Sequence, residues 1–392
     1  QIPVLRPISL PTRTKRGTVG NPLHSHRVSR RQVLALTVMG MAMLPLTSCA
    51  LSAAQPRKPE GTITIGYVPI ACTAPLILAD AQGYFADHNV TVSLRKYAGW
   101  ADLWSAYATG EIHVAHMLAP MPLAINAGVT NAARPTELVF TQNTNGQAII
   151  LANTHRNVVT TAVDLRGMTI GIPFEFSAHS LLLRDYLTAH GLDPDRDLEL
   201  RLLRPADMVA QLQIGTIDGF IGPEPFIQRA ITAGSGYVFT FTHELWPNHP
   251  CCAIAMATDW RQSHPAEAIA ITQALAAGAQ AAGNHDHAAN TAHILGSEQY
   301  LNQPEKLFIP ALQEPDRIKF GTPTDHTAIT WMATQIARWR LGNNTLDWDD
   351  ATILRLATNT VGDSYNTTID PITVNGQPFN PLIPTATYTA HP

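Results

Sequence analysis

Apolar and polar positions follow one another in a repeating strand and helix order through the first part of the chain. The expected strands are residues 62–67, 90–97 and 113–117, and the expected helices are residues 75–84 and 101–109. Gly83 and Gly110 stand where the two helices should end. Strands that alternate with helices form a mostly parallel sheet, because each crossing helix packs against a face of that sheet. The pattern predicts an α/β unit.

The same order returns after a polar stretch of the chain. The second set is a turn and strand over 165–172, strands over 198–202 and 219–221, and helices over 180–190 and 206–214. The chain then crosses back through residues 237–242 and 253–257 into helices over 265–282 and 326–341. Two similar α/β lobes joined by crossing strands form a clamp that closes on a hinge. Its ligand is expected at the carboxyl ends of the strands, between the lobes.

These patterns set the expected domain boundaries. Lobe 1 takes residues 61–155, lobe 2 takes residues 156–245, and residues 246–345 return to lobe 1 and supply the C-terminal helices. Residues 346–392 are rich in proline, asparagine and threonine, and we expect this tail to be irregular.

Composition and charge fit a globular protein that does not bind nucleic acid. The chain has 392 residues, of which 45% are hydrophobic and 14% are charged, enough for two cores. Seven of its 26 basic residues and none of its 30 acidic residues lie in residues 1–48, so the remainder is markedly acidic. No run of five basic residues offers the surface that a phosphate backbone requires.

The first part of the chain is typical of an export signal with a lipid attachment site. Residues 29–49 begin with Ser29-Arg30-Arg31, continue through an apolar stretch and end in Leu46-Thr47-Ser48-Cys49. This order predicts a twin-arginine signal followed by a lipobox, in which Cys49 is acylated. A buried helix over the apolar stretch is the alternative. The body would then be held at the outer face of the cytoplasmic membrane by a tether of residues 50–60, and residues 1–28 stay unassigned.

Motifs of the common enzyme classes are missing from the sequence. It contains no glycine-rich phosphate loop, no His-Glu-x-x-His, no Gly-x-Ser-x-Gly and no Cys-x-x-Cys. We therefore predict a binding protein and not an enzyme.

Several short motifs, in order and at characteristic spacing, carry a resemblance to one family of binding proteins. They are Ala74-Pro75-Leu76-Ile77, Gly83-Tyr84-Phe85, residues 115–122, Asn145-Gly146-Gln147, Glu224-Pro225-Phe226, residues 245–250 and residues 331–339. The chain resembles the nitrate/bicarbonate-binding lipoproteins of ABC importers, within the nitrate, sulfonate and taurine class, over roughly residues 62–345. The resemblance implies a two-lobed periplasmic-binding-protein type II fold with hinge strands. It also implies a monomer that delivers a small polar or anionic solute to an ABC permease and its ATPase subunits.

The same resemblance implies which residues hold the solute. In the nitrate binders of this family an aromatic residue, a glutamine, a histidine and a lysine bind the anion, and three of these match Trp100, Gln147 and His179. Where the family has His-Pro-Glu-Lys this chain has His249-Pro250-Cys251-Cys252, so Cys252 takes the place of the lysine. Where the family has an acidic residue before Ala-Pro, this chain has Cys72.

Each of these candidate binding residues also has a purely structural interpretation. Trp100 suits a packed core position, His179 a helix cap, and Gln147 a hydrogen bond to its own turn. In the functional interpretation Glu224 binds a cationic group of the ligand or a metal. In the structural one its carboxylate bridges backbone groups of the hinge. For His116 a hydrogen-bonded core histidine is the better interpretation.

The cysteines suggest a second function. If Cys72, Cys251 and Cys252 meet near His179, they form a set suited to Zn(II) or Cu(I), and a transition metal is the one cofactor that we expect. The alternatives are small apolar loop residues, thiols that contact an organic ligand, or a disulfide from Cys72 to one of the pair. A metal-binding or metal-sensing lipoprotein is therefore the second hypothesis. A protein related to the thiamine-pyrimidine-precursor synthases, which have a similar fold and a cysteine cluster, is the third.

Overall fold

Three parallel strands begin the first sheet, as the early strand and helix alternation predicts. The computed structural model describes residues 61–129, 134–323, 325–342, 346–361 and 369–391, all within one compact unit, Lys58–Pro392. The six strands lie in the order β11 (Ile318–Phe320), β4 (Thr136–Asn145), β10 (Pro250–Ala257), β3 (Val114–Leu118), β1 (Ile63–Tyr67) and β2 (Val92–Lys96). Strands β2, β1 and β3 pair in parallel, whereas β10 runs antiparallel to both β3 and β4.

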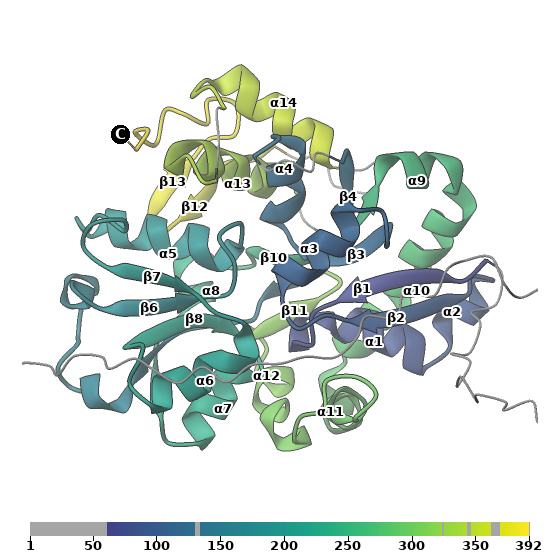
Figure 1. Cartoon of the computed structure of the whole chain (residues 1–392), viewed down its shortest axis with the longest axis horizontal. Helices are drawn as coiled ribbons and strands as arrows, with labels where there is room; N and C mark the ends of the chain where they lie inside the picture. The colour runs from purple at the N-terminus through teal and green to yellow at the C-terminus, as the bar shows by residue number, and fades with distance from the viewer. Residues whose placement is uncertain (1–60, 130–133, 324, 343–345, 362–368, 392) are drawn as a thin grey trace, which may run out of the picture. The chain divides into compact units, whose positions relative to one another are not determined.

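The second sheet repeats this plan with five strands. Their order is β7 (Glu199–Leu202), β6 (Thr169–Ile172), β8 (Gly219–Pro223), β5 (Gln147–Ala152) and β9 (Gly236–Phe241). Figure 1 shows β6, β7 and β8 side by side, and these three pair in parallel, while β5 runs antiparallel to β8 and β9. In each sheet an antiparallel strand lies beside the parallel set: β10 pairs with β3 in the first sheet, and β5 pairs with β8 in the second.

The α/β class is confirmed, with two differences in detail. Each sheet is mixed, because β10 joins the first sheet and β5 the second in antiparallel pairing, so the expected parallel pairing holds only within the two three-stranded sets. The chain passes from the first sheet to the second at Gly146, between β4 and β5, and not at the expected boundary after residue 155. Gly146 has a φ of 91°, a value that favours glycine at this sharp change of direction.

Helices connect and cover the strands. In chain order they are α1 (Ala74–Ala81), α2 (Tyr84–Asp87), α3 (Trp100–Ala108), α4 (Pro120–Asn126), α5 (Ala178–Ala189), α6 (Pro205–Gln213), α7 (Phe226–Thr232), α8 (Thr242–Leu245), α9 (Thr258–Ser263), α10 (Pro265–Ala282), α11 (Ala288–Gly296), α12 (Ile309–Gln313), α13 (His326–Trp339) and α14 (Asp350–Thr360). Short 3₁₀ turns are η1 (Ala71–Thr73), η2 (Asn153–His155), η3 (Ala162–Leu165), η4 (His285–His287) and η5 (Glu305–Leu307). Among the described residues, no helix combines the length and the apolar character needed to cross a bilayer.

The expectation of an irregular tail is wrong for much of residues 346–392. Helix α14 occupies its start, and β12 (Ile372–Val374) pairs with β13 (Gln377–Phe379) around Asn375-Gly376. Both turn residues have positive φ, 50° and 74°, which is the conformation of a tight two-residue hairpin turn.

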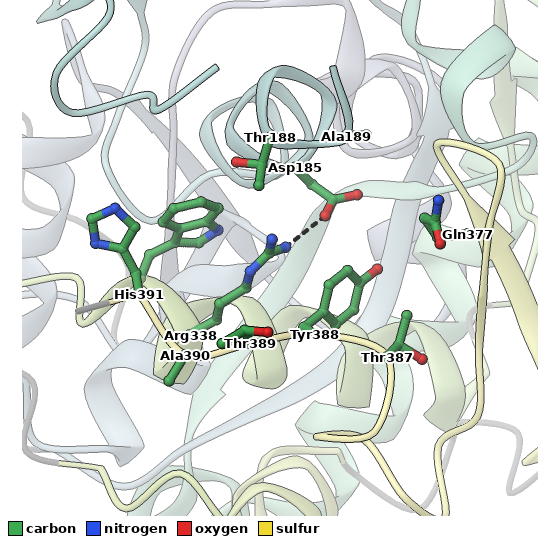
Figure 2. A pocket seen from close by; sticks show the side chains of 11 residues that line it. Asp185, Thr188, Ala189, Arg338, Gln377, Thr387, Tyr388, Thr389, Ala390 and His391 are labelled. Atoms are coloured by element: carbon green, nitrogen blue, oxygen red, sulfur yellow. Dashed lines mark hydrogen bonds and ion pairs between the residues drawn. The ribbon is translucent and has the colours of Figure 1, made fainter. Parts of the chain in front are cut away.

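The end of the tail packs against α5 and α13, and Figure 2 shows the pocket that they line. There the buried Asp185 accepts a hydrogen bond from Arg338 at 2.7 Å, and the Tyr388 ring lies 4.4 Å from the Arg338 guanidinium carbon. Trp331 donates to the Tyr388 hydroxyl at 2.9 Å. These contacts fix the tail on the body.

The expected export signal (29–49), the lipid attachment at Cys49, the tether (50–60) and the extension (1–28) all lie outside the described residues. They remain predictions.

Candidate functional site

Trp100 and His116 form one buried polar pair at the first sheet. Trp100 is the first residue of α3, which follows β2, and His116 lies in the middle of β3. Their ring centroids are 6.5 Å apart and neither side chain is more than 1% exposed. The Trp100 Nε1 donor and both His116 ring nitrogens have no hydrogen-bond partner. Burial lowers the pKa of His116 to about 3, so this imidazole is neutral at pH 7.

His179 presents a second set of unpartnered polar atoms. It is the second residue of α5, a helix capped by Ser177, whose hydroxyl accepts from the Ser180 N–H at 2.9 Å. His179 is fully buried and both of its ring nitrogens lack a partner, as does the Ser180 hydroxyl. Burial, with a smaller contribution from the nearby His249, lowers the pKa of His179 to about 3. Helix α5 contacts β10 of the first sheet.

Sequence reasoning missed a third element of the site, a polar run in β4. Residues 141–145 read Thr-Gln-Asn-Thr-Asn, although this stretch of strand is buried. Thr141 pairs with Ala253 and Asn143 with Cys252, so the intervening Gln142 has no opposite residue and forms a bulge. Both amide atoms of Gln142 are buried without a partner. A run of polar residues inside a strand of an otherwise apolar core was the available signal.

Gln147 lies where its structural interpretation expects it. Its amide nitrogen donates to the Asn145 carbonyl across the Gly146 turn. Thr242 donates to the Gln147 side-chain oxygen at 3.4 Å and to its backbone carbonyl at 3.0 Å. These contacts tie β5 to α8, and a role for Gln147 in solute binding stays a prediction.

Glu224 pairs with a cation that sequence reasoning did not identify. It follows β8 of the second sheet and is fully buried. Its carboxylate accepts a hydrogen bond at 2.8 Å from the Nε of Arg317, a residue that directly precedes β11 of the first sheet. Its other carboxylate oxygen accepts from the Gln228 N–H, and its backbone carbonyl accepts from the Ala71 N–H at 2.9 Å. Burial outweighs the Arg317 charge and raises the pKa of Glu224. The ion pair joins the second sheet to the first, through the Arg317 side chain and not through hinge backbone.

The structure brings the three cysteines together. Cys72 lies in η1 after β1, and Cys251 and Cys252 lie at the start of β10; all three are fully buried, with sulfur atoms within 4.8 Å of one another. Burial raises the pKa of Cys251 and Cys252. Burial by itself would raise the pKa of the Cys72 thiol, but hydrogen bonds involving Cys251, Cys252, the Cys72 backbone and Asn143 together outweigh it and lower the pKa to about 5. Among the described residues no histidine or carboxylate completes this group, so His179 is not part of it.

The arrangement offers hydrogen-bonding groups to a polar solute. Unpartnered donors and acceptors come from Trp100, His116, Gln142 and His179, and each buried polar atom left unpaired costs about 1–3 kcal/mol. A solute that satisfies these atoms recovers that free energy.

Comparison with known proteins identifies the family of this chain. A model of the NMT1-like family matches residues 56–296, which is more than half of the sequence. The chain belongs to the NMT1-like family.

Relatives with curated names are transport proteins. This NMT1-like chain is 32% identical over 304 residues to the bicarbonate transport ATP-binding protein CmpC of Synechocystis sp., an alignment that covers 71% of the chain and 46% of CmpC. It is 31% identical over 271 residues to the nitrate/nitrite binding protein NrtA of Nostoc sp., covering 64% of the chain and 61% of that protein. The chain therefore spans about half the length of the ATP-binding relatives that it matches.

A solved structure confirms the fold. The periplasmic nitrate-binding protein NrtA of Synechocystis superimposes with a TM-score of 0.77, over 83% of this chain and 97% of that one, at 23% identity. The NMT1-like chain thus has the fold of a periplasmic binding protein, as the sequence motifs predicted.

Proposed function

We propose that this chain is the substrate-binding component of an ABC importer, and that it holds a small polar or anionic solute of the nitrate, sulfonate and bicarbonate class. The observation that carries the proposal is the set of buried, unpartnered polar atoms on Trp100, His116, Gln142 and His179. An oxyanion accepts hydrogen bonds from such donors, and the start of α5 adds the partial positive charge of a helix N-terminus.

The names of the relatives support the solute class and the partners. The similar proteins are named for bicarbonate transport and for nitrate or nitrite binding. By analogy, this chain would pass its solute to a permease energised by ATPase subunits and would act outside the cytoplasmic membrane. It would be a monomer held there by a lipid on Cys49. The solute would leave chemically unchanged.

The binding site can be tested by calorimetry. We would titrate the full chain with nitrate, bicarbonate and an alkanesulfonate. The solute whose binding heat is detected would then be titrated into the Trp100→Ala and His179→Ala variants. Losing one buried hydrogen bond to the solute should weaken binding by about 5- to 150-fold, equivalent to about 1–3 kcal/mol. His287→Ala, which removes an exposed histidine, is the matched control and should leave the affinity unchanged.

Two outcomes would count against the proposal. Wild-type affinity in both Trp100→Ala and His179→Ala, with each variant folded, would remove these residues from the site. Recovery of the solute in a chemically altered form after incubation would point to an enzyme.

A further inference from the structure

Three cysteines that are far apart in the sequence converge in the core, on backbone segments that are separately fixed. The Ala71 N–H, beside Cys72, donates to the Glu224 carbonyl at 2.9 Å. The Cys251 carbonyl accepts from the Ala119 N–H at 2.8 Å, and Cys252 pairs with Leu118 of β3. The sulfur atoms are therefore held by the sheet and by η1, and their convergence does not depend on loose loops.

The course of β10 turns two adjacent cysteines toward the same place. Neighbouring residues of a regular strand point to opposite faces of a sheet. Here the sulfur atoms of Cys251 and Cys252 are only 3.5 Å apart, and both lie within 4.8 Å of the Cys72 sulfur. The pairing of β10 with β4 shifts register on each side of Cys252, and such bulges re-aim side chains. The irregular pairing gathers three thiols where a regular ladder would separate them.

The sulfur spacing suits a shared metal ion. With metal to sulfur bonds of about 2.3 Å, three thiolates around one ion lie about 3.8–4.0 Å apart, in tetrahedral or trigonal geometry. The observed separations, 3.5 Å for the adjacent pair and at most 4.8 Å within the group, bracket that value. A disulfide between Cys251 and Cys252 is disfavoured, because consecutive Cα atoms lie about 3.8 Å apart, below the range that disulfides require.

The donor set selects the class of metal. All ligand atoms that the described residues bring together here are sulfur, and no carboxylate or imidazole joins them. Soft thiolates favour Cu(I) and Zn(II) over hard ions such as Mg²⁺ and Ca²⁺. Three sulfurs satisfy Cu(I) completely, whereas Zn(II) would keep one position for a further ligand.

We propose that Cys72, Cys251 and Cys252 form a buried three-thiolate site for a thiophilic d¹⁰ metal ion. The site is separate in its chemistry from the proposed oxyanion site, since it uses none of the unpartnered nitrogen and oxygen atoms of Trp100, His116, Gln142 and His179. Binding releases the thiol protons to solvent and requires no change of oxidation state, provided that copper is supplied as Cu(I).

The test counts metal and thiols in the full chain. In a Cys49→Ser background the three clustered thiols are the only ones left of the four cysteines. The reduced, metal-free protein would be titrated without oxygen with Cu(I), and separately with Zn(II), against a chromophoric chelator. We expect one ion per chain from at least one of the two metals, with all three thiols protected from a thiol reagent. We expect Cys252→Ser to weaken binding by at least about a hundredfold, more than is usual for loss of an outer-shell group.

If the serine variants fold poorly, X-ray absorption can count the sulfur neighbours of the metal instead. The protein for this measurement is metal-loaded and retains all three cysteines of the cluster. Three sulfur neighbours at about 2.3 Å are expected. The proposal is overturned if neither metal is retained, if fewer than three sulfurs surround it, or if a folded Cys252→Ser chain binds it with unchanged affinity. Oxyanion titration of a folded chain with all three cysteines replaced by serine reports on the proposed transport function separately.

Discussion

At the scale of single residues, buried histidines, His116 and His179 among them, make the stability of the chain depend on pH. Burial lowers the pKa of both His116 and His179 to about 3, against 6.5 in the unfolded chain. The unfolded chain therefore binds more protons between about pH 3 and 6.5, and the free energy of unfolding falls as the pH falls through that window. At pH 5 each neutral, buried histidine lowers that free energy by about 2 kcal/mol relative to pH 7.5.

Urea denaturation at pH 7.5 and pH 5 measures this effect. His116→Phe removes one titrating group from the core, so its loss of stability between the two pH values should be smaller than that of the wild type by about 2 kcal/mol. His287→Ala, at an exposed position, should behave as the wild type. An equal loss in all three proteins would mean that His116 is protonated, or accessible to water, in the folded chain.

The sequence identified some site residues from motifs and missed others for a physical reason. Trp100 and His179 were predicted from motif position, and the structure places both in the core with polar atoms unpaired. Arg317 was missed because its role depends on Glu224, 93 positions away in the chain. Gln142 was missed because a bulge, which depends on pairing between β4 and β10, decides where its side chain lies. Partners that are distant in sequence carry no local signal.

At the scale of elements, the packing of α1 on α10 positions the loop that carries Cys72. Gly278 of α10 lies so close to the Pro75 carbonyl of α1 that an added Cβ would fall well inside contact distance. Gly278→Ala would gain about 1 kcal/mol of helix propensity but would force the two helices apart. Such overpacking costs about 1–3 kcal/mol, so we expect a net loss of stability.

Thermal unfolding compares Gly278→Ala with Gln280→Ala, which substitutes an exposed position of the same helix. The control should have an unchanged or slightly raised midpoint, and Gly278→Ala a lower one. A raised midpoint in Gly278→Ala would show that α1 and α10 can separate without cost.

Periodicity predicted the two strand and helix alternations well, but it missed α4, β4 and β5 between them and much of the tail. The strand and helix alternation of residues 62–117 appears as β1, α1, β2, α3 and β3, because buried strands and amphipathic helices repeat with different periods. The hairpin β12–β13 had a local signal, Asn375-Gly376, the pair most typical of a tight turn. Overall composition in proline, asparagine and threonine outweighed that signal in the prediction of an irregular tail. Strands of three residues are too short to show alternation.

At the scale of the whole described unit, contacts join segments that follow the parallel strands of the two sheets. Trp104 of α3 stacks near Phe174 and Phe176, which follow β6, with ring centroids 5.9 and 6.1 Å away. Asp102 of α3 accepts from Arg204, which follows β7, at 3.2 Å. If the sheets separate on the hinge to admit solute, these contacts form only on closure.

Trp104→Ala should therefore weaken solute binding through the closing equilibrium. Removing the ring lowers the population of the closed, binding-competent state, and the apparent dissociation constant rises in inverse proportion to that population. We expect a loss of affinity on the order of tenfold, from a shift of about 1.4 kcal/mol in the equilibrium. Calorimetry with the solute that wild-type protein binds gives the affinity, and small-angle scattering without solute should show a larger radius of gyration in the variant.

Trp348→Ala is the control, because it removes a partly buried tryptophan that belongs to neither side of the contact. It should change neither the affinity nor the radius of gyration. A Trp104→Ala chain that loses affinity at an unchanged radius of gyration would show that Trp104 supports the site directly and not through closure. Unchanged affinity together with unchanged scattering would mean that the ring contacts with Phe174 and Phe176 do not control access of the solute.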